Sequence, residues 1–171
     1  MPEQILAAVL DTPIGPLSLL AHGDRLIAGG FTARPDEMYT RLHRSLRGYP
    51  LSQVAAGDLP WLAKPLRGYF AGDLRAMDGI PVHQPGSPGR QRLWAELRAV
   101  TPGSTVTYTD LAARAGCPGA PRAAGAACAL NLIAPVVPCH RAVGSNGSLT
   151  GYYYGLDRKR WLLRHESART D

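Results

Sequence analysis

The most informative stretch of the chain runs from Thr107 to Leu130 and reads TYTDLAARAGCPGAPRAAGAACAL. Its pattern predicts a short helix over Thr107–Ala115, a glycine-rich turn at 116–119, and a second helix over Ala120–Leu130. Two helices joined by a short turn with glycine have the outline of a helix-turn-helix. Many helical hairpins share this outline, so by itself it is a weak signal of DNA binding.

The second predicted helix consists almost entirely of small residues. Arg122 is its only charged residue, and Ala123 and Gly125 lie in a run of alanines. A helix without bulky side chains can bring its backbone close to another surface. The same composition also suits a helix packed inside a core, so both interpretations stay open at this point.

Downstream of this helix, an apolar extended segment over Leu132–Val137 leads into Pro138-Cys139-His140-Arg141. A thiol next to His and Arg has an electropositive setting, which lowers its pKa and raises the fraction of nucleophilic thiolate. Adjacent side chains do not face each other, so we expect His140 to act on Cys139 through a bridging water.

His140 then needs a carboxylate to orient its other ring nitrogen. Glu166 is the best candidate, because it ends an amphipathic helix predicted over Asp157–Glu166 that must pack against this part of the chain. The other acidic residues of the second half are Glu96, Asp110, Asp157 and Asp171. Cys117 and Cys128 fit packing roles, and we expect both to be chemically silent.

The first half of the chain has the pattern of a small domain with strands and helices. The predicted elements are strands over Ile5–Asp11, Leu17–Ala21 and Arg25–Phe31 and helices over Asp36–Leu46 and Trp61–Phe70. A linker with two prolines and two glycines follows at 83–89, before a helix predicted over Arg90–Val100. We therefore expect an α+β fold with two domains, residues 1–84 and 85–171.

Charge is distributed unevenly over the 171 residues, whose formal net charge is +6. Residues 1–85 hold 8 basic and 8 acidic residues, and residues 86–171 hold 11 and 5, so the second half carries the whole excess. A basic half beside a neutral half favours a polyanionic partner, although a solvated basic face is the simpler alternative.

Composition excludes several classes of protein. The start, MPEQILAAVLD, has an acidic residue where a signal peptide needs a basic region. The longest near-apolar stretch, 123–137, contains Asn131 and Pro135 and falls short of the ~20 residues of a membrane span. Three cysteines without CxxC spacing favour neither a disulfide framework nor zinc. We expect no bound metal and a reducing, cytoplasmic setting.

Over roughly residues 90–166 the chain resembles the O6-alkylguanine-DNA alkyltransferases, also called methylated-DNA–protein-cysteine methyltransferases. The resemblance rests on TYTDLA at 107–112, RAAG at 122–125, Asn131, VVPCHR at 136–141, GSLTGY at 147–152 and RWLLRHE at 160–166. It implies a ribonuclease H-like α/β domain over 1–84 and a mostly helical, DNA-binding alkyltransferase domain with a helix-turn-helix over 85–171. It further implies a monomeric DNA repair protein without a cofactor.

The resemblance also assigns chemical roles. Cys139 would accept the alkyl group of O6-alkylguanine in a single turnover, with O4-alkylthymine as a further candidate substrate. His140 would be the water-mediated base, and Glu166 would hold His140. Tyr108 would donate a proton or hydrogen bond to guanine N3, and Asn131 would be a structural hinge beside the acceptor.

The same resemblance implies double-stranded DNA as the partner, bound through the minor groove with the damaged base flipped into a pocket. Arg122 would fill the gap that the flipped nucleotide leaves. The expected DNA contacts are Thr107, Arg122, Ala123, Gly125 and Arg141. The expected pocket residues are Tyr108, Ala142, Tyr152, Tyr153 and Tyr154.

Three other functions compete with this interpretation. A non-catalytic alkyltransferase-like protein that binds damaged DNA would lack the acceptor cysteine, which is present here as Cys139. A helix-turn-helix regulator would carry polar side chains for base edges on its second helix, where only Arg122 is available. A thiol hydrolase would turn over repeatedly and would need an oxyanion hole, of which the sequence shows no sign.

Overall fold

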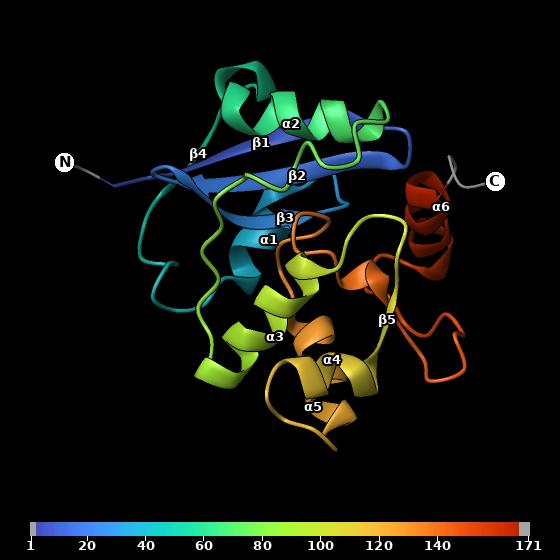
Figure 1. The fold of residues 1–171 in the computed structure, drawn as a ribbon. Helices are drawn as coiled ribbons and strands as arrows, with labels where there is room; N and C mark the ends of the chain where they lie inside the picture. The colour runs from blue at the N-terminus through green and yellow to red at the C-terminus, as the bar shows by residue number, and fades with distance from the viewer. Residues whose placement is uncertain (1–2, 168–171) are drawn as a thin grey trace. The chain divides into compact units, whose positions relative to one another are not determined.

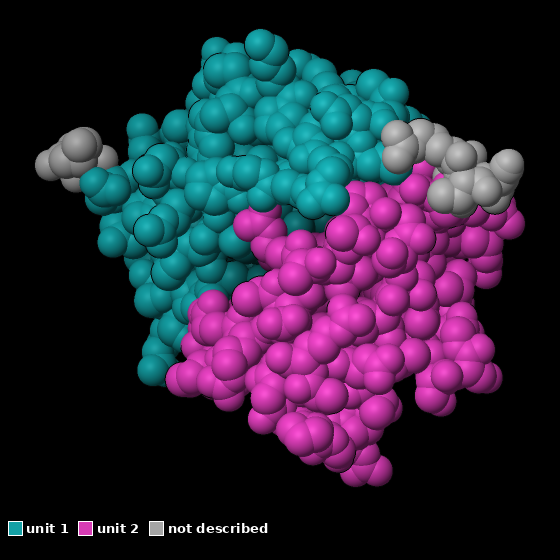
Figure 2. Space-filling view, in the orientation of Figure 1, with its two compact units in different colours: residues 1–85, 132–136 teal, residues 86–131, 137–171 magenta. Residues whose placement is uncertain are grey.

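The computed structural model describes residues 3–167, and its elements follow the order drawn in Figure 1. The described chain divides into two compact units, coloured in Figure 2: residues up to Pro85 together with Leu132–Val136, and Gly86–Asn131 together with the described residues from Val137 onward. The predicted domains differ from these units in the segment Leu132–Val136. The α+β fold class is confirmed, since a sheet with covering helices and a mainly helical part are both present.

The first unit is built on a sheet with the strand order β3-β2-β1-β4. Strands β1 (Ile5–Thr12), β2 (Gly15–His22) and β3 (Arg25–Gly30) are antiparallel neighbours, and the short β4 (Leu51–Gln53) pairs parallel with β1. Both hairpins close over two residues: Gly23 of the second turn has a positive φ, which such turns favour, and in the first hairpin the positive-φ glycine, Gly15, directly follows the turn residues Pro13 and Ile14. The predicted strands are therefore present.

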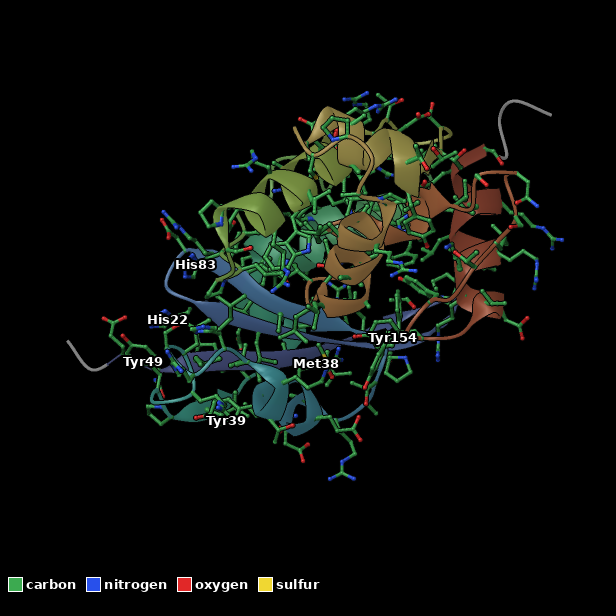
Figure 3. All side chains as sticks on the ribbon, turned by 90° about the horizontal axis from the view of Figure 1, so that it is seen from below. His22, Met38, Tyr39, Tyr49, His83 and Tyr154 are labelled. Carbon is green, nitrogen blue, oxygen red and sulfur yellow. The ribbon has the colours of Figure 1, made fainter. Side chains whose placement is uncertain are left out.

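Two helices accompany this sheet, α1 (Pro35–Arg41) and α2 (Pro60–Phe70), with a 3-10 turn η1 (Ala56–Asp58) before α2. Met38 of α1, labelled in Figure 3, belongs to the apolar core beneath the sheet. The helix predicted over Asp36–Leu46 is five residues too long, because the backbone becomes extended at Leu42. Leu42 and Leu46 are buried in the core although they lie on turns. Their four-residue spacing therefore predicted burial correctly and helical structure wrongly.

The segment Leu132–Val136 runs along β3 in the first unit. Gly29 donates its N–H to Leu132 O at 2.8 Å, and Ala134 returns a bond to Gly29 O at 2.9 Å. A Cβ on Gly29 would lie 2.6 Å from Ala134 O, so only glycine permits this approach. The pairing fixes the chain just before it reaches Cys139.

The second unit holds the predicted pair of short helices, α4 (Tyr108–Arg114) and α5 (Pro121–Leu130), packed on α3 (Pro88–Ala99). Trp94 of α3 donates its indole N–H to Ala127 O at 2.9 Å, a carbonyl in the last turn of α5 that has no helical partner. This bond joins the two helices. The predicted helix-turn-helix outline is thus present.

The remaining elements of the second unit surround Cys139. A 3-10 turn η2 (Cys139–Arg141) leads into β6 (Ala142–Val143), which pairs parallel with β5 (Val106–Thr107). The final helix is α6 (Leu156–Ser167), close to the predicted Asp157–Glu166. Within residues 3–167, no helix has the length and apolar character needed to cross a membrane.

Candidate active site around Cys139

Cys139 stands at the start of η2 and faces a cavity of about 320 Å³ within the second unit. Its side chain is nearly buried, with 8% of the residue exposed. The cavity is lined by α5 on one side and by the loop before α6 on another. The lining residues are Tyr108, Gly125, Cys128, Ala129, Asn131, Cys139, Gly151, Tyr152, Tyr153 and Tyr154. A small molecule or a single base that enters this cavity therefore meets the thiol.

Asn131 ends α5 and holds the turn that carries Cys139. Its side-chain amide donates to Val137 O at 2.8 Å and also hydrogen bonds to the Cys139 thiol. Asn131 is itself buried, so neither bond competes with solvent. This arrangement links the end of α5 to the turn that carries Cys139, and the hinge role that the resemblance implies for Asn131 stays a prediction.

Behind the thiol lies a buried group of three charged or titratable side chains. His140 Nε2 lies 2.7 Å from Glu166 Oε2, so the expected partner of His140 is present. Arg141 donates Nε and Nη2 to the two Glu166 oxygens at 2.9 Å each, and Nη1 to Val100 O at 2.7 Å. A carboxylate facing Nε2 fixes the tautomer with hydrogen on that nitrogen. Within the described chain His140 Nδ1 has no hydrogen-bond partner, so it is available as a proton acceptor.

The electrostatics of this group favour a neutral imidazole at His140. Burial lowers the pKa of His140 and outweighs Glu166, which acts to raise it. Burial alone would raise the pKa of Glu166, but His140 and Arg141 reverse this, and the pKa of Glu166 lies well below its usual value. An ionised Glu166 and a neutral imidazole follow, with Arg141 balancing the carboxylate charge.

The expected lowering of the Cys139 pKa is wrong for the free protein. Burial raises the pKa of this thiol, and the hydrogen bond from Asn131 and the charge of Lys159 offset the rise only in part. The sequence showed the basic neighbours but not the depth at which the sulfur lies. A thiol with a raised pKa needs a base to remove its proton before it can act as a nucleophile.

Lys159 is a site residue that the sequence reasoning missed. It lies on α6, is fully buried, and donates Nζ to Ala142 O at 2.8 Å, Thr150 O at 3.2 Å and Gly151 O at 3.5 Å. Three acceptors match the three N–H donors of an ammonium group. Burial lowers the pKa of Lys159, while the nearby Cys139 and Cys128 act to raise it. Lys159 thus fixes the cavity loop and places a positive charge near the thiol.

Replacing Lys159 with methionine is expected to raise the pKa of Cys139. Because one pKa unit changes the thiolate fraction tenfold, alkylation of Cys139 by iodoacetamide at neutral pH should slow by about tenfold. The rate is measured from about pH 6 to pH 10 by mass spectrometry of the Cys139 peptide. The other titratable or charged groups of the cavity and of the buried cluster behind it are Tyr108, Cys128, His140, Arg141, Tyr152, Tyr153, Tyr154 and Glu166.

Lys159→Arg is the control for charge, since it keeps a cation and should keep the pH profile. Folding of each variant is followed by circular dichroism at every pH. A folded Lys159→Met protein with the pH profile of the wild type would show that Lys159 acts on the loop alone.

Four of the predicted DNA contacts are at least partly exposed: three lie on α5 and one, Thr107, lies at the start of α4. Arg122, Ala123 and the partly exposed Gly125 lie on α5, and Arg122 and Ala123 are exposed. A Cβ added to Gly125 would meet no neighbouring atom within 4 Å, so space is open beside the helix there. Thr107 is half-exposed and accepts a bond from Asp110 N at 3.0 Å, which makes it the N-cap of α4.

Two predicted roles are contradicted by burial. Arg141 was expected to contact DNA, but only 2% of it is exposed, and its guanidinium donates to Glu166 and to Val100 O. Ala142 was expected in the pocket wall, but it is fully buried in β6, where its carbonyl oxygen accepts from Lys159. Both roles came from the resemblance alone, which carries no information on how deeply η2 and β6 are buried.

The predicted pocket tyrosines do line the cavity, and Cys128 lines it too. Tyr108 hydrogen bonds through its hydroxyl to Thr150 Oγ1 at 2.8 Å, and burial raises its pKa. Cys128 was assigned to packing because its helix is rich in alanine, yet it shares the cavity with Cys139. Burial raises the pKa of Cys128 far above that of an ordinary thiol. Within residues 3–167, no cluster of three His, Cys, Asp or Glu side chains could hold a metal.

The fold and the site define a class: a helix-turn-helix protein with a buried cysteine at a cavity, a histidine next to it in the chain, and a carboxylate hydrogen-bonded to that histidine. Residues 88–168 match the family model described as 6-O-methylguanine DNA methyltransferase, DNA binding domain. The methylated-DNA–protein-cysteine methyltransferase of Salmonella typhimurium is 41% identical over 95% of this chain and 96% of its own length. That of Mycobacterium tuberculosis is 37% identical over 94% and 91%.

Solved structures give the same result. A crystal structure of Mycobacterium tuberculosis OGT in complex with DNA is 35% identical, covers 96% of this chain and 94% of its own, and has a TM-score of 0.78. An O6-methylguanine-DNA methyltransferase from Pyrococcus kodakaraensis shares the fold at 22% identity, with a TM-score of 0.64. The chain belongs to the methylated-DNA–protein-cysteine methyltransferase family.

Proposed function

We propose that this protein repairs DNA by taking the alkyl group from O6-alkylguanine onto Cys139, once per molecule. The observation that carries the proposal is the order of groups at the site. A cavity leads to Cys139, and the adjacent His140 has Glu166 at 2.7 Å from its Nε2 and, among residues 3–167, no hydrogen-bond partner at its Nδ1. This order supplies a nucleophile, a base and a group that orients the base. Membership of the family gives the substrate class.

The proposed chemistry is an in-line displacement. The Cys139 thiol gives its proton through a water to His140 Nδ1, and Glu166 stabilises the imidazolium that forms. The thiolate attacks the alkyl carbon, so an S–C bond forms as the C–O6 bond breaks. Tyr108 donates a hydrogen bond to the departing guanine anion, and the proton held on His140 Nδ1 passes through water to that anion, which gives neutral guanine and neutral His140. The alkyl group stays on Cys139 because a thioether is not readily hydrolysed, so each protein molecule reacts once.

We further propose that the base reaches the cavity by flipping out of duplex DNA. A thiolate inside a pocket cannot reach guanine O6 within the base stack. The exposed, small-residue face of α5 suits close approach to the minor groove, with Arg122 inserted where the base has left. The net charge of +6 favours phosphate contacts and salt-sensitive binding. We expect a monomer, and a cytoplasmic setting that keeps its three free cysteines reduced.

Mass spectrometry tests the proposed function directly. The protein is incubated with duplex DNA that carries O6-methylguanine, digested, and mapped for the mass of one methyl group. We expect one methyl on Cys139 and restored guanine in the duplex. A methyl group on Cys117 or Cys128, repeated turnover, or tight binding of the lesion without transfer contradicts the proposal, and the last result indicates a damage-binding protein instead.

A further inference from the structure

Three consecutive tyrosines, Tyr152, Tyr153 and Tyr154, line the same cavity as Cys139. They differ in exposure: Tyr152 and Tyr154 are half-buried, whereas 67% of Tyr153 is exposed. Tyr153 is the most exposed of the large hydrophobic residues identified on the described surface. An aromatic ring that lines a cavity and stays exposed to solvent contributes little to the core. Such a ring is a candidate contact for a ligand that enters the cavity.

The position of the Tyr153 ring is fixed by its neighbours. Its centroid lies 4.9 Å from that of Tyr154 at 72°, and Tyr154 lies 5.8 Å from Tyr152 at 71°. Both contacts are edge-to-face arrangements, which favour defined geometry. Tyr154, labelled in Figure 3, is tied to α6 through its carbonyl oxygen, which accepts from Arg158 Nη1 at 3.2 Å. The Tyr153 ring is therefore exposed, and it packs against Tyr154, whose backbone is hydrogen-bonded to α6.

We propose that Tyr153 is the stacking residue for the flipped base, covering the base once it has entered the cavity beside Cys139. A base that leaves the duplex loses its stacking partners, and a protein aromatic ring can replace one of them. Helix α5 contributes only small side chains to the cavity, at Gly125, Cys128 and Ala129. Of the four tyrosine rings that line it, Tyr153 is the exposed one, whereas the other three are half-buried. The inference rests on the proposed function, because it takes a flipped base as the ligand.

The cavity also limits what can be stacked. Its volume of about 320 Å³ lies at the small end of the ~300–1,000 Å³ typical of ligand sites. A planar base with a small substituent fits such a space better than one with a bulky aromatic adduct. The ligand class is therefore a single nucleobase with a small alkyl group, held between α5 and the tyrosine loop.

Tyr153→Ala tests the proposal, with Tyr153→Phe as the matched control that keeps the ring and loses only the hydroxyl. Two probes are used: a duplex with O6-methylguanine and a short single-stranded oligonucleotide with the same base. We expect Tyr153→Ala to lower the second-order rate of methyl transfer by about tenfold on both probes, since base–aromatic stacking has that magnitude. Tyr153→Phe should stay within about twofold of the wild type.

A second measurement does not depend on transfer. In a Cys139→Ala background, the preference for the methylated oligonucleotide over the unmodified one is measured at equilibrium, with and without Tyr153→Ala. We expect this preference to fall by about tenfold while binding of unmodified duplex is unchanged. Full activity of folded Tyr153→Ala, or a loss confined to duplex DNA together with weaker binding of unmodified duplex, overturns the stacking role. Failure of the wild type to transfer methyl overturns the proposed function, and the equilibrium preference then decides the stacking role by itself.

Discussion

The Cys139→Ala variant is expected to transfer no alkyl group and to bind DNA as tightly as the wild type. The loss is complete because the only other thiol in the cavity, Cys128, is a poor substitute. Burial raises the pKa of Cys128 far above the ordinary value, so its thiolate is negligible at neutral pH. DNA affinity is kept because Cys139 is 8% exposed inside the cavity, whereas Arg122 and Ala123 of α5 face solvent.

The measurement combines radiolabel transfer from O6-methylguanine duplex with gel-shift binding of unmodified duplex. Cys128→Ser and Cys117→Ser are the matched controls, and both should transfer at close to the wild-type rate. Methyl transfer by Cys139→Ala would identify Cys128 as a second acceptor and would contradict the assignment of Cys139 as the sole one. Loss of transfer together with loss of binding would instead point to a folding defect, which circular dichroism detects.

Local sequence patterns were sufficient for most of the helices and for the antiparallel strands. Helices α3, α5 and α6 have strong apolar periodicity or start and stop signals, and each lies within two residues of its predicted bounds. The pairs β5–β6 and β1–β4 could not be predicted, because strands of two or three residues carry no periodicity and form only by long-range pairing. The pairing of Leu132–Val136 with β3 could not be predicted either, because it is also a long-range contact of a short segment.

At the site, the sequence predicted the pairing of His140 with Glu166 but not how deeply the neighbouring side chains are buried. Glu166 could be assigned to His140 because few acidic residues were available. Lys159 and Arg141 could not be placed, since lysine and arginine are rarely buried and their partners here are carbonyl oxygens and a carboxylate remote in sequence. The pKa of Cys139 was misjudged because burial, which dominates it, depends on the whole fold.

The Glu166→Gln variant is expected to lose about 3–5 kcal/mol of unfolding free energy, because it leaves the buried Arg141 guanidinium without a counter-charge. Glu166 accepts three bonds, one from His140 and two from Arg141, and its side chain is fully buried. A glutamine amide would turn its NH2 group toward one of these donors. His140 Nε2 would then have to accept rather than donate, and Nδ1 would carry the hydrogen. The base is lost as well, so methyl transfer should fall about a hundredfold or more.

The stability difference should also depend on pH in a defined direction. The folded-state pKa of Glu166 is lowered, so its contribution is present above the ordinary glutamate pKa, about 4.3, and is lost as pH falls below that value. Urea unfolding of wild type and Glu166→Gln should therefore differ most near neutral pH, and the difference should begin to shrink only below about pH 4 and fall further as pH approaches the lowered folded-state pKa of Glu166. Asp157→Asn is the matched control on the same helix, because its ion pair with Arg160 is exposed and contributes at most about 1 kcal/mol. Equal stability of Glu166→Gln and the wild type at neutral pH would show that the Arg141 charge is compensated by Val100 O and its surroundings without Glu166.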